Sequence, residues 1–245
     1  MSGWRTIEIG GKAADVYEPR SGSAGGADDA AILHLHGHGL ATLKDNAPFT
    51  AEFEKHGLRV VCPHGARSWW LDRVCAEFDP HVTPRRHLLD AVVPWIAERW
   101  GIEPPRIGLT GVSMGGQGAL LLAYRHPRTF PVVAAISPAV DFHIWHGRGL
   151  PLDEMCATRE DARQETATLH LHPLNWPKHQ LIVCDPGDED WFEGIERLAS
   201  KLRSTGIPFE HDLETRHGGH GWPYFEHMAE RVVGFVADRL GRPGG

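Results

Sequence analysis

The sequence predicts an α/β fold in which a mostly parallel central sheet is covered by helices on both faces. Two observations predict it: strand-like and helix-like segments alternate along the chain, and most of the strand-like segments are apolar throughout, as in strands buried on both faces. Strands are expected at 30–36, 58–65, 106–113, 132–138 and 180–187, with a shorter one near 208–214.

The segments between these strands carry helical periodicity and residues that end helices. A hairpin around Gly10-Gly11 is expected first, at 6–19, followed by a Gly/Ser-rich loop at 21–29. The helical pattern at 83–101 contains Pro94, which should kink the helix or mark a boundary. Helices are expected at 47–56, 83–101, 115–127, 191–205 and 223–240.

One segment, 139–178, breaks the alternation. It is polar and aromatic, lies between two expected strands, and is too long for an ordinary connection. We expect one domain spanning residues 1–245, with 139–178 as a small lid or cap insertion.

Composition narrows the class of protein. The formal net charge is −7 and Lys and Arg are scattered, which argues against nucleic acid or an anionic membrane as partner. No run of about 18 uncharged apolar residues is present, as a membrane helix would need. The opening MSGWRTIEIG has no apolar core of a signal peptide, and the four cysteines form no CxxC pair. We expect a cytoplasmic protein with reduced thiols, and homo-oligomerisation stays open.

The stretch GVSMG, residues 111–115, matches the pattern G-x-S-x-G between an expected strand and an expected helix. The chain must turn sharply there, and the glycines keep side chains out of the tight corner, so that Ser113 stands clear as a nucleophile. The alternative is a glycine-rich turn that binds phosphate. A P-loop would carry a lysine after its glycines, and none follows here.

A serine nucleophile needs a base and an acid, which in this arrangement follow it in the order Ser, acid, His. The acid is expected in DPGDEDWF, 185–192, where Asp185, Asp188 and Asp190 compete. Asp190 is favoured because it lies just before a helix, where it could reach back across the sheet edge. Asp188 is the main alternative, and Asp141, after the preceding strand, is a remote one.

The base is expected in RHGGHGWPYF, residues 216–225. His220 lies deep in this loop with glycines on both sides, which gives the chain freedom to turn its ring toward the serine. His217 is nearer the strand end and is expected to be structural.

These segments together resemble the putative-esterase family of α/β-hydrolases, which includes S-formylglutathione hydrolases, feruloyl esterases and mycolyltransferases. The resemblance covers about 30–240 and implies an α/β-hydrolase fold with a Ser113, Asp190 and His220 triad. It implies a serine esterase that hydrolyses a small-molecule ester without a cofactor, or a thioesterase or acyltransferase with the same triad. The segment 60–72 resembles one that lines the family's substrate cleft, which points to Trp69 and Trp70.

The stretch LHLHGHGL, 33–40, contains three alternating histidines and matches the family's H-G-x-G loop. Acyl transfer needs two N–H donors for the oxyanion, expected from Met114 and from His38 or its neighbour Gly39. Gly37 and Gly39 would make room for substrate. Zinc binding by HxHxH is the alternative, but with the triad accounted for we expect no metal.

Several tryptophans flank the expected site loops. Of these, Trp69, Trp70, Trp191 and Trp222 are predicted to contact substrate, with Trp145 as a further neighbour. Flat apolar walls of this kind suit short acyl, aryl or sugar esters in solution.

Overall fold

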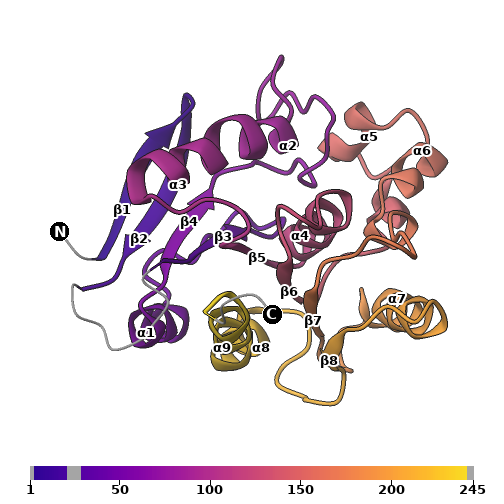
Figure 1. Cartoon of the computed structure of the whole chain (residues 1–245). Helices are drawn as coiled ribbons and strands as arrows, with labels where there is room; N and C mark the ends of the chain where they lie inside the picture. The colour runs from indigo at the N-terminus through magenta and orange to yellow at the C-terminus, as the bar shows by residue number, and fades with distance from the viewer. Residues whose placement is uncertain (1–2, 21–28, 242–245) are drawn as a thin grey trace.

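The central feature of the computed structural model, which describes residues 3–20 and 29–241, is an eight-stranded sheet (Figure 1). Its strand order is β1-β2-β4-β3-β5-β6-β7-β8. The strands are β1 (Gly3–Ile9), β2 (Lys12–Glu18), β3 (Ala31–Leu35), β4 (Arg59–Pro63), β5 (Ile107–Val112), β6 (Val132–Ile136), β7 (His179–Val183) and β8 (Glu210–Asp212). Of the loop predicted at 21–29, residues 21–28 lie outside the described residues.

Six strands of the sheet run parallel, as predicted. β4 pairs in parallel with β3, and the parallel order continues through β5, β6, β7 and β8. The first two strands form the predicted hairpin and join the sheet antiparallel to β4. Every residue of β3, β5 and β6 is buried, which explains why these strands are mostly apolar.

Helices cover both faces of the sheet and bury two separate apolar clusters. α1, α8 and α9 lie on one face, and α3, α4 and α7 pack on the cluster of the other. The helices are α1 (Ala47–His56), α2 (Pro84–His87), α3 (Val93–Trp100), α4 (Met114–Arg125), α5 (Pro151–Met155), α6 (Arg159–Gln164), α7 (Phe192–Ser204), α8 (Trp222–His227) and α9 (Ala229–Leu240). Within the described ranges, none of them has the length and apolar character that a bilayer crossing requires.

The predicted disturbance around Pro94 takes the form of a π-helical turn. α2 continues into η1 (Leu88–Val92), a π-helix, before α3 begins at Val93. Proline has no N–H to donate to the carbonyl four residues earlier, and the wider π-helical turn accommodates this missing hydrogen bond. The final predicted helix is also divided, because Met228 has a ψ of 0° between α8 and α9.

The insertion at 139–178 is a set of short helices rather than an open loop. It holds α5 and α6 between two 3-10 turns, η2 (Phe142–Trp145) and η3 (Ala167–Leu169). The buried Gln117 of α4 fastens it, since its amide donates to the carbonyl of Glu165 and accepts the N–H of Ala167. Its action as a lid stays a prediction.

The corner between β5 and α4 is held by two glycines that permit contact between backbones. A Cβ on Gly115 would lie 1.9 Å from the carbonyl oxygen of Leu35 in β3, and one on Gly111 would lie 2.3 Å from the carbonyl oxygen of Gly115. No real side chain tolerates such distances. The predicted need for glycine at both positions therefore has a direct steric cause.

We predict that Gly115→Ala lowers the free energy of unfolding by about 3 kcal/mol or more, because the backbone of β3 would have to move. Urea denaturation measures this. Gly39→Ala is the matched control, since a Cβ there meets nothing within 4 Å. Equal stability of the two variants would contradict the packing at this corner.

Candidate active site

A line of hydrogen bonds joins three side chains from three loops at the carboxyl ends of the strands. Ser113 Oγ lies 3.0 Å from Nε2 of His220, and Nδ1 of His220 lies 2.7 Å from Oδ2 of Asp188. Ser113 has φ 54° and ψ −118°, a strained conformation for a residue other than glycine. The structure thus brings together the predicted serine and histidine and supplies Asp188 as the carboxylate.

The choice of Asp190 as the acid is corrected. The chain after β7 turns back on itself, with the N–H of Asp188 bonded to the carbonyl of Asp185, and this turn directs Asp188 inward. Its side chain has no exposed surface, whereas Asp190 lies two residues further on and is exposed. Asp141 is occupied elsewhere, in an ion pair with Arg197.

Both oxygens of Asp188 have defined partners, which fixes the carboxylate. Oδ1 accepts the N–H of Trp191 at 3.1 Å, and Oδ2 faces His220 and the thiol of Cys184, which lies 3.6 Å away. The indole of Trp191 meets the edge of the His220 ring at 6.4 Å between centroids. A carboxylate held in this way keeps a proton on Nδ1 and leaves Nε2 free to accept one.

Asp185 ties together the two loops that carry the acid and the base. Its carboxylate accepts the N–H of Gly187 at 2.7 Å in its own loop and those of His217 and Gly219 in the loop of His220. Burial opposes ionisation, but these three N–H groups prevail and hold the pKa of Asp185 below its usual range. Sequence reasoning treated Asp185 only as a weak candidate acid, and nothing in the sequence revealed its bonds to residues more than 30 positions away.

The segments of the two predicted oxyanion donors, Met114 and His38, lie beside Ser113. The N–H of Met114 is the first of α4 and has no acceptor within the helix. The loop of His38 lies alongside, since a Cβ on Gly37 would be 3.4 Å from the Cβ of Ser113. The predicted donors thus belong to segments that flank the serine.

Two of the three alternating histidines, His34 and His36, have separate hydrogen-bond partners. His34 is fully buried and bonds Thr110, whereas His36 bonds the carbonyl of Gly37 through Nδ1 and accepts the N–H of Gly65 through Nε2. Burial lowers the pKa of His34 to about 3 and that of His36 to about 4, so both rings are neutral. Across residues 3–20 and 29–241, no three His, Cys, Asp or Glu side chains are grouped so that they could hold a metal ion.

An apolar pocket of 330 Å³ opens in front of Ser113 and His220. Among the predicted substrate-binding residues, Trp222, Gly37 and Gly39 line it. The remaining lining residues are His38, Leu40, Ala41, Val112, Trp145, Gly221 and Phe225. The aromatic wall is therefore made mainly by Trp145 and Trp222.

The prediction that Trp69, Trp70 and Trp191 line the cleft is corrected, because all three are at most 2% exposed. Trp70 packs against Gly118 of α4 and donates its indole N–H to the carbonyl of His36. Trp69 and Trp191 pack behind Trp145, with ring centroids 5.8 and 5.4 Å away. They support the walls of the pocket instead of forming them.

The pocket residues that were not predicted are Leu40, Ala41, Val112, Gly221 and Phe225. A signal existed in the sequence, because each of them lies within five residues of the HGHG loop, the predicted serine or the predicted base. Their apolar character alone does not distinguish a pocket wall from the core.

Fold and site together define the class of the protein as an α/β-hydrolase with a serine at its strand–helix corner. The chain belongs to the putative esterase family, whose model matches residues 16–231. Solved structures with the same fold include an S-formylglutathione hydrolase from Agrobacterium tumefaciens, with a TM-score of 0.77, 18% identity and coverage of 97% of this chain and 94% of that one. A ferulic acid esterase has a TM-score of 0.75 and 15% identity, and each chain is covered to 97%.

Sequence comparison finds relatives with a different named activity. The diacylglycerol acyltransferase/mycolyltransferase Ag85B of Mycobacterium intracellulare is 23% identical over 198 residues, which cover 71% of this chain. The match spans 60% of the length of that relative. The proteins similar to this chain therefore carry the names of both hydrolases and acyltransferases.

We predict that Asp188→Asn lowers kcat for a p-nitrophenyl ester by about 10⁴-fold, because an amide no longer holds the reactive tautomer of His220. Asp190→Asn is the matched control and should keep kcat within about twofold, as for other exposed substitutions. The reverse pattern would restore Asp190 as the acid.

We predict that Asp185→Asn lowers the free energy of unfolding at pH 7 by about 2 kcal/mol, since the amide N–H₂ would face backbone N–H groups. The folded carboxylate has a lowered pKa, so its contribution is complete above the unfolded pKa and is lost as the pH falls through the folded pKa. The gap between wild type and variant should therefore narrow below about pH 4. Urea denaturation of both proteins at pH 7 and below about pH 4 measures this difference in the free energy of unfolding. A difference that does not change with pH would contradict an ionised Asp185.

Proposed function

We propose that the protein is a serine carboxylic ester hydrolase that acts on small soluble esters through an acyl-enzyme on Ser113. The observation that carries the proposal is the continuous chain from Ser113 Oγ through both ring nitrogens of His220 to the buried Asp188. The match to the putative esterase family supports it.

In the acylation step, Oγ of Ser113 attacks the ester carbonyl carbon while Nε2 of His220 takes its proton. Asp188 stabilises the imidazolium that results. The carbonyl oxygen becomes negative and accepts hydrogen bonds from the N–H groups of Met114 and His38, each worth about 3 kcal/mol of barrier in comparable enzymes. The imidazolium then protonates the leaving alcohol as its bond to the carbonyl carbon breaks.

In the deacylation step, water takes the place of the alcohol. His220 removes a proton from this water, which attacks the acyl carbon, and the same oxyanion donors are used again. The proton returns to Oγ of Ser113 as the acid departs. No group beyond the triad and the two N–H donors is required.

The size and lining of the pocket favour a small acyl group. A volume of 330 Å³ is at the lower end for sites that hold a small molecule. Trp145 and Trp222 offer flat faces, and Val112 and Phe225 close the apolar side. These features support short acyl, aryl or sugar esters as substrates.

We predict that Ser113→Ala abolishes hydrolysis of p-nitrophenyl acetate and labelling by a fluorophosphonate, while the unfolding transition remains that of a folded protein. The hydroxyl is the attacking atom, so nothing else can form the covalent adduct. A His217→Ala variant, altered in the same loop as the base, should keep most of the activity. Turnover by the Ser113→Ala protein would exclude this serine as the nucleophile.

Acyl transfer is the second candidate, favoured by the acyltransferase names of the curated relatives. The residues would be the same, but an alcohol or sugar hydroxyl would replace water in the second step. A thioesterase would differ only in the leaving group. Added alcohols during ester turnover distinguish the first two, since a transferase forms new ester at the expense of free acid.

A further inference from the structure

A second pocket lies on the face of the sheet that α3 and α4 cover, away from the triad. It has a volume of 470 Å³ and is lined by Asp72, Arg85, Arg86, Leu89, Asp90, Arg125 and His126. None of these residues lines the pocket in front of Ser113. Arg125 ends α4 and Ser113 precedes it, so the two pockets are separated by a helix of about 18 Å.

The floor of this pocket is a buried arginine without a full set of partners. The side chain of Arg85 is 6% exposed, and its Nε and Nη2 atoms have no hydrogen-bond acceptor among the described residues. The nearest carboxylate oxygen, Oε2 of Glu165, lies 3.6 Å from Nη2, beyond hydrogen-bond distance. A buried guanidinium left in this state costs free energy, and an unoccupied ligand site is one of its ordinary explanations.

The same carboxylate is already shared. Oε2 of Glu165 also lies 3.3 Å from Arg125, and its Oε1 lies 3.2 Å from Nε of Arg73. One negative charge thus serves three guanidinium groups, and among the described residues only Arg73 of the three has a second carboxylate within ion-pair distance, that of Asp161. Arg85 and Arg125 are left with an excess of positive charge between them.

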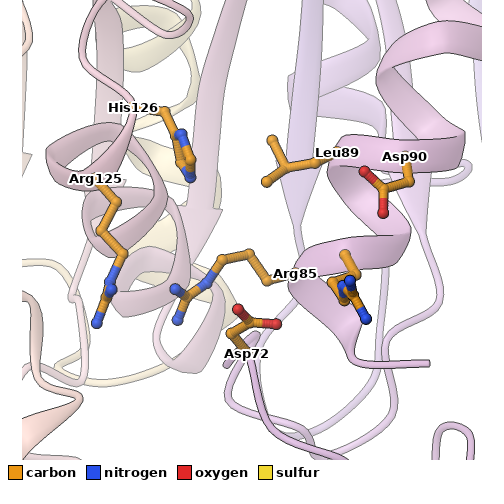
Figure 2. A pocket seen from close by; sticks show the side chains of 7 residues that line it. Asp72, Arg85, Leu89, Asp90, Arg125 and His126 are labelled. Carbon is orange, nitrogen blue, oxygen red and sulfur yellow. The ribbon is translucent and has the colours of Figure 1, made fainter. Parts of the chain in front are cut away.

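The cationic groups converge on the same space. Figure 2 shows the guanidinium of Arg85 extended toward Arg125, with the ring of His126 directed into the gap between them. Burial is the largest cause that lowers the pKa of both Arg85 and His126, and the neighbouring arginines lower it further. Asp72 opposes this shift for both groups, and Glu165 opposes it for Arg85.

Two carboxylates share this pocket, and Figure 2 shows that of Asp72 beside the side chain of Arg85. Asp72 and Asp90 are exposed, whereas Arg85 is buried, so water screens the negative groups and not the positive one. Asp72 also accepts the hydroxyl of Thr83 at 2.6 Å. The depth of the pocket is therefore cationic even though its rim carries both signs.

We propose that this pocket binds the phosphate group of a small phosphorylated molecule, held by Arg85, Arg125 and His126. A phosphate has enough oxygens to accept from donors on both sides, whereas one guanidinium already satisfies a carboxylate. The volume exceeds that of the ion alone, and Leu89 supplies an apolar surface for the remainder of the molecule.

The test measures binding of glycerol 3-phosphate, inorganic phosphate and acetate by titration calorimetry and by the shift in Tm, with sodium chloride at equal ionic strength as reference. We expect saturable binding in the order glycerol 3-phosphate, phosphate, acetate, with a Tm that rises with ligand concentration. Arg85→Gln and Arg125→Gln should each weaken phosphate binding by about tenfold or more, since a charge-assisted hydrogen bond is lost.

Arg239→Gln is the control, because it also removes an arginine from an ion pair, with Glu210 on another part of the surface, and should leave binding unchanged. The half-exposed Arg125 keeps the test decisive if the Arg85 variant fails to fold. No saturable binding up to ~10 mM, a weak limit for specific sites, or equal binding by all variants would overturn the site. Equal affinity for inorganic phosphate and glycerol 3-phosphate would contradict the proposal that the ligand is a phosphorylated small molecule. Tighter binding of acetate than of phosphate would contradict the proposal that the pocket binds phosphate.

Discussion

The contact between the first turn of α4 and the end of β3 is the constraint on which the active site depends. Because Gly115 lies against the carbonyl of Leu35, the helix starts closer to the sheet than any side chain would allow. The same contact places the loop after β3 beside Ser113. One steric condition therefore fixes both the strained nucleophile and the loop that carries the second N–H donor.

The other half of the site depends on a carboxylate that touches no substrate. Asp188 and His220 come from the loops after β7 and β8. Asp185 collects N–H groups from both loops, and its ionised state holds them in one arrangement. The geometry of Asp188 and His220 is thus set by a neighbour three residues away in sequence from the acid.

The sequence predicted most of the fold and, of the three hydrogen-bonded side chains at the proposed site, the serine and the histidine. Ser113 and His220 could be predicted from the sequence because glycines flank both residues and because the strand–helix pattern around Ser113 is local. Asp190 was favoured over Asp188, because the direction of each carboxylate depends on a tight turn that closes at Asp185. The burial of Trp69 and Trp70 could not be predicted from neighbouring residues in the sequence either. Both have positive φ, and packing with α4 and the insertion turns them into the core.

Glu165 connects the two pockets through its two ends. Its carboxylate contacts Arg85 and Arg125, and its carbonyl accepts a hydrogen bond from Gln117, one turn beyond Ser113. A connection of this kind transmits a signal only if some element along it has two arrangements. Gln117 is fully buried and its amide is bonded on both sides, which favours one arrangement of this link. Occupation of the cationic pocket should accordingly stabilise the fold while leaving the chemistry at Ser113 nearly unchanged.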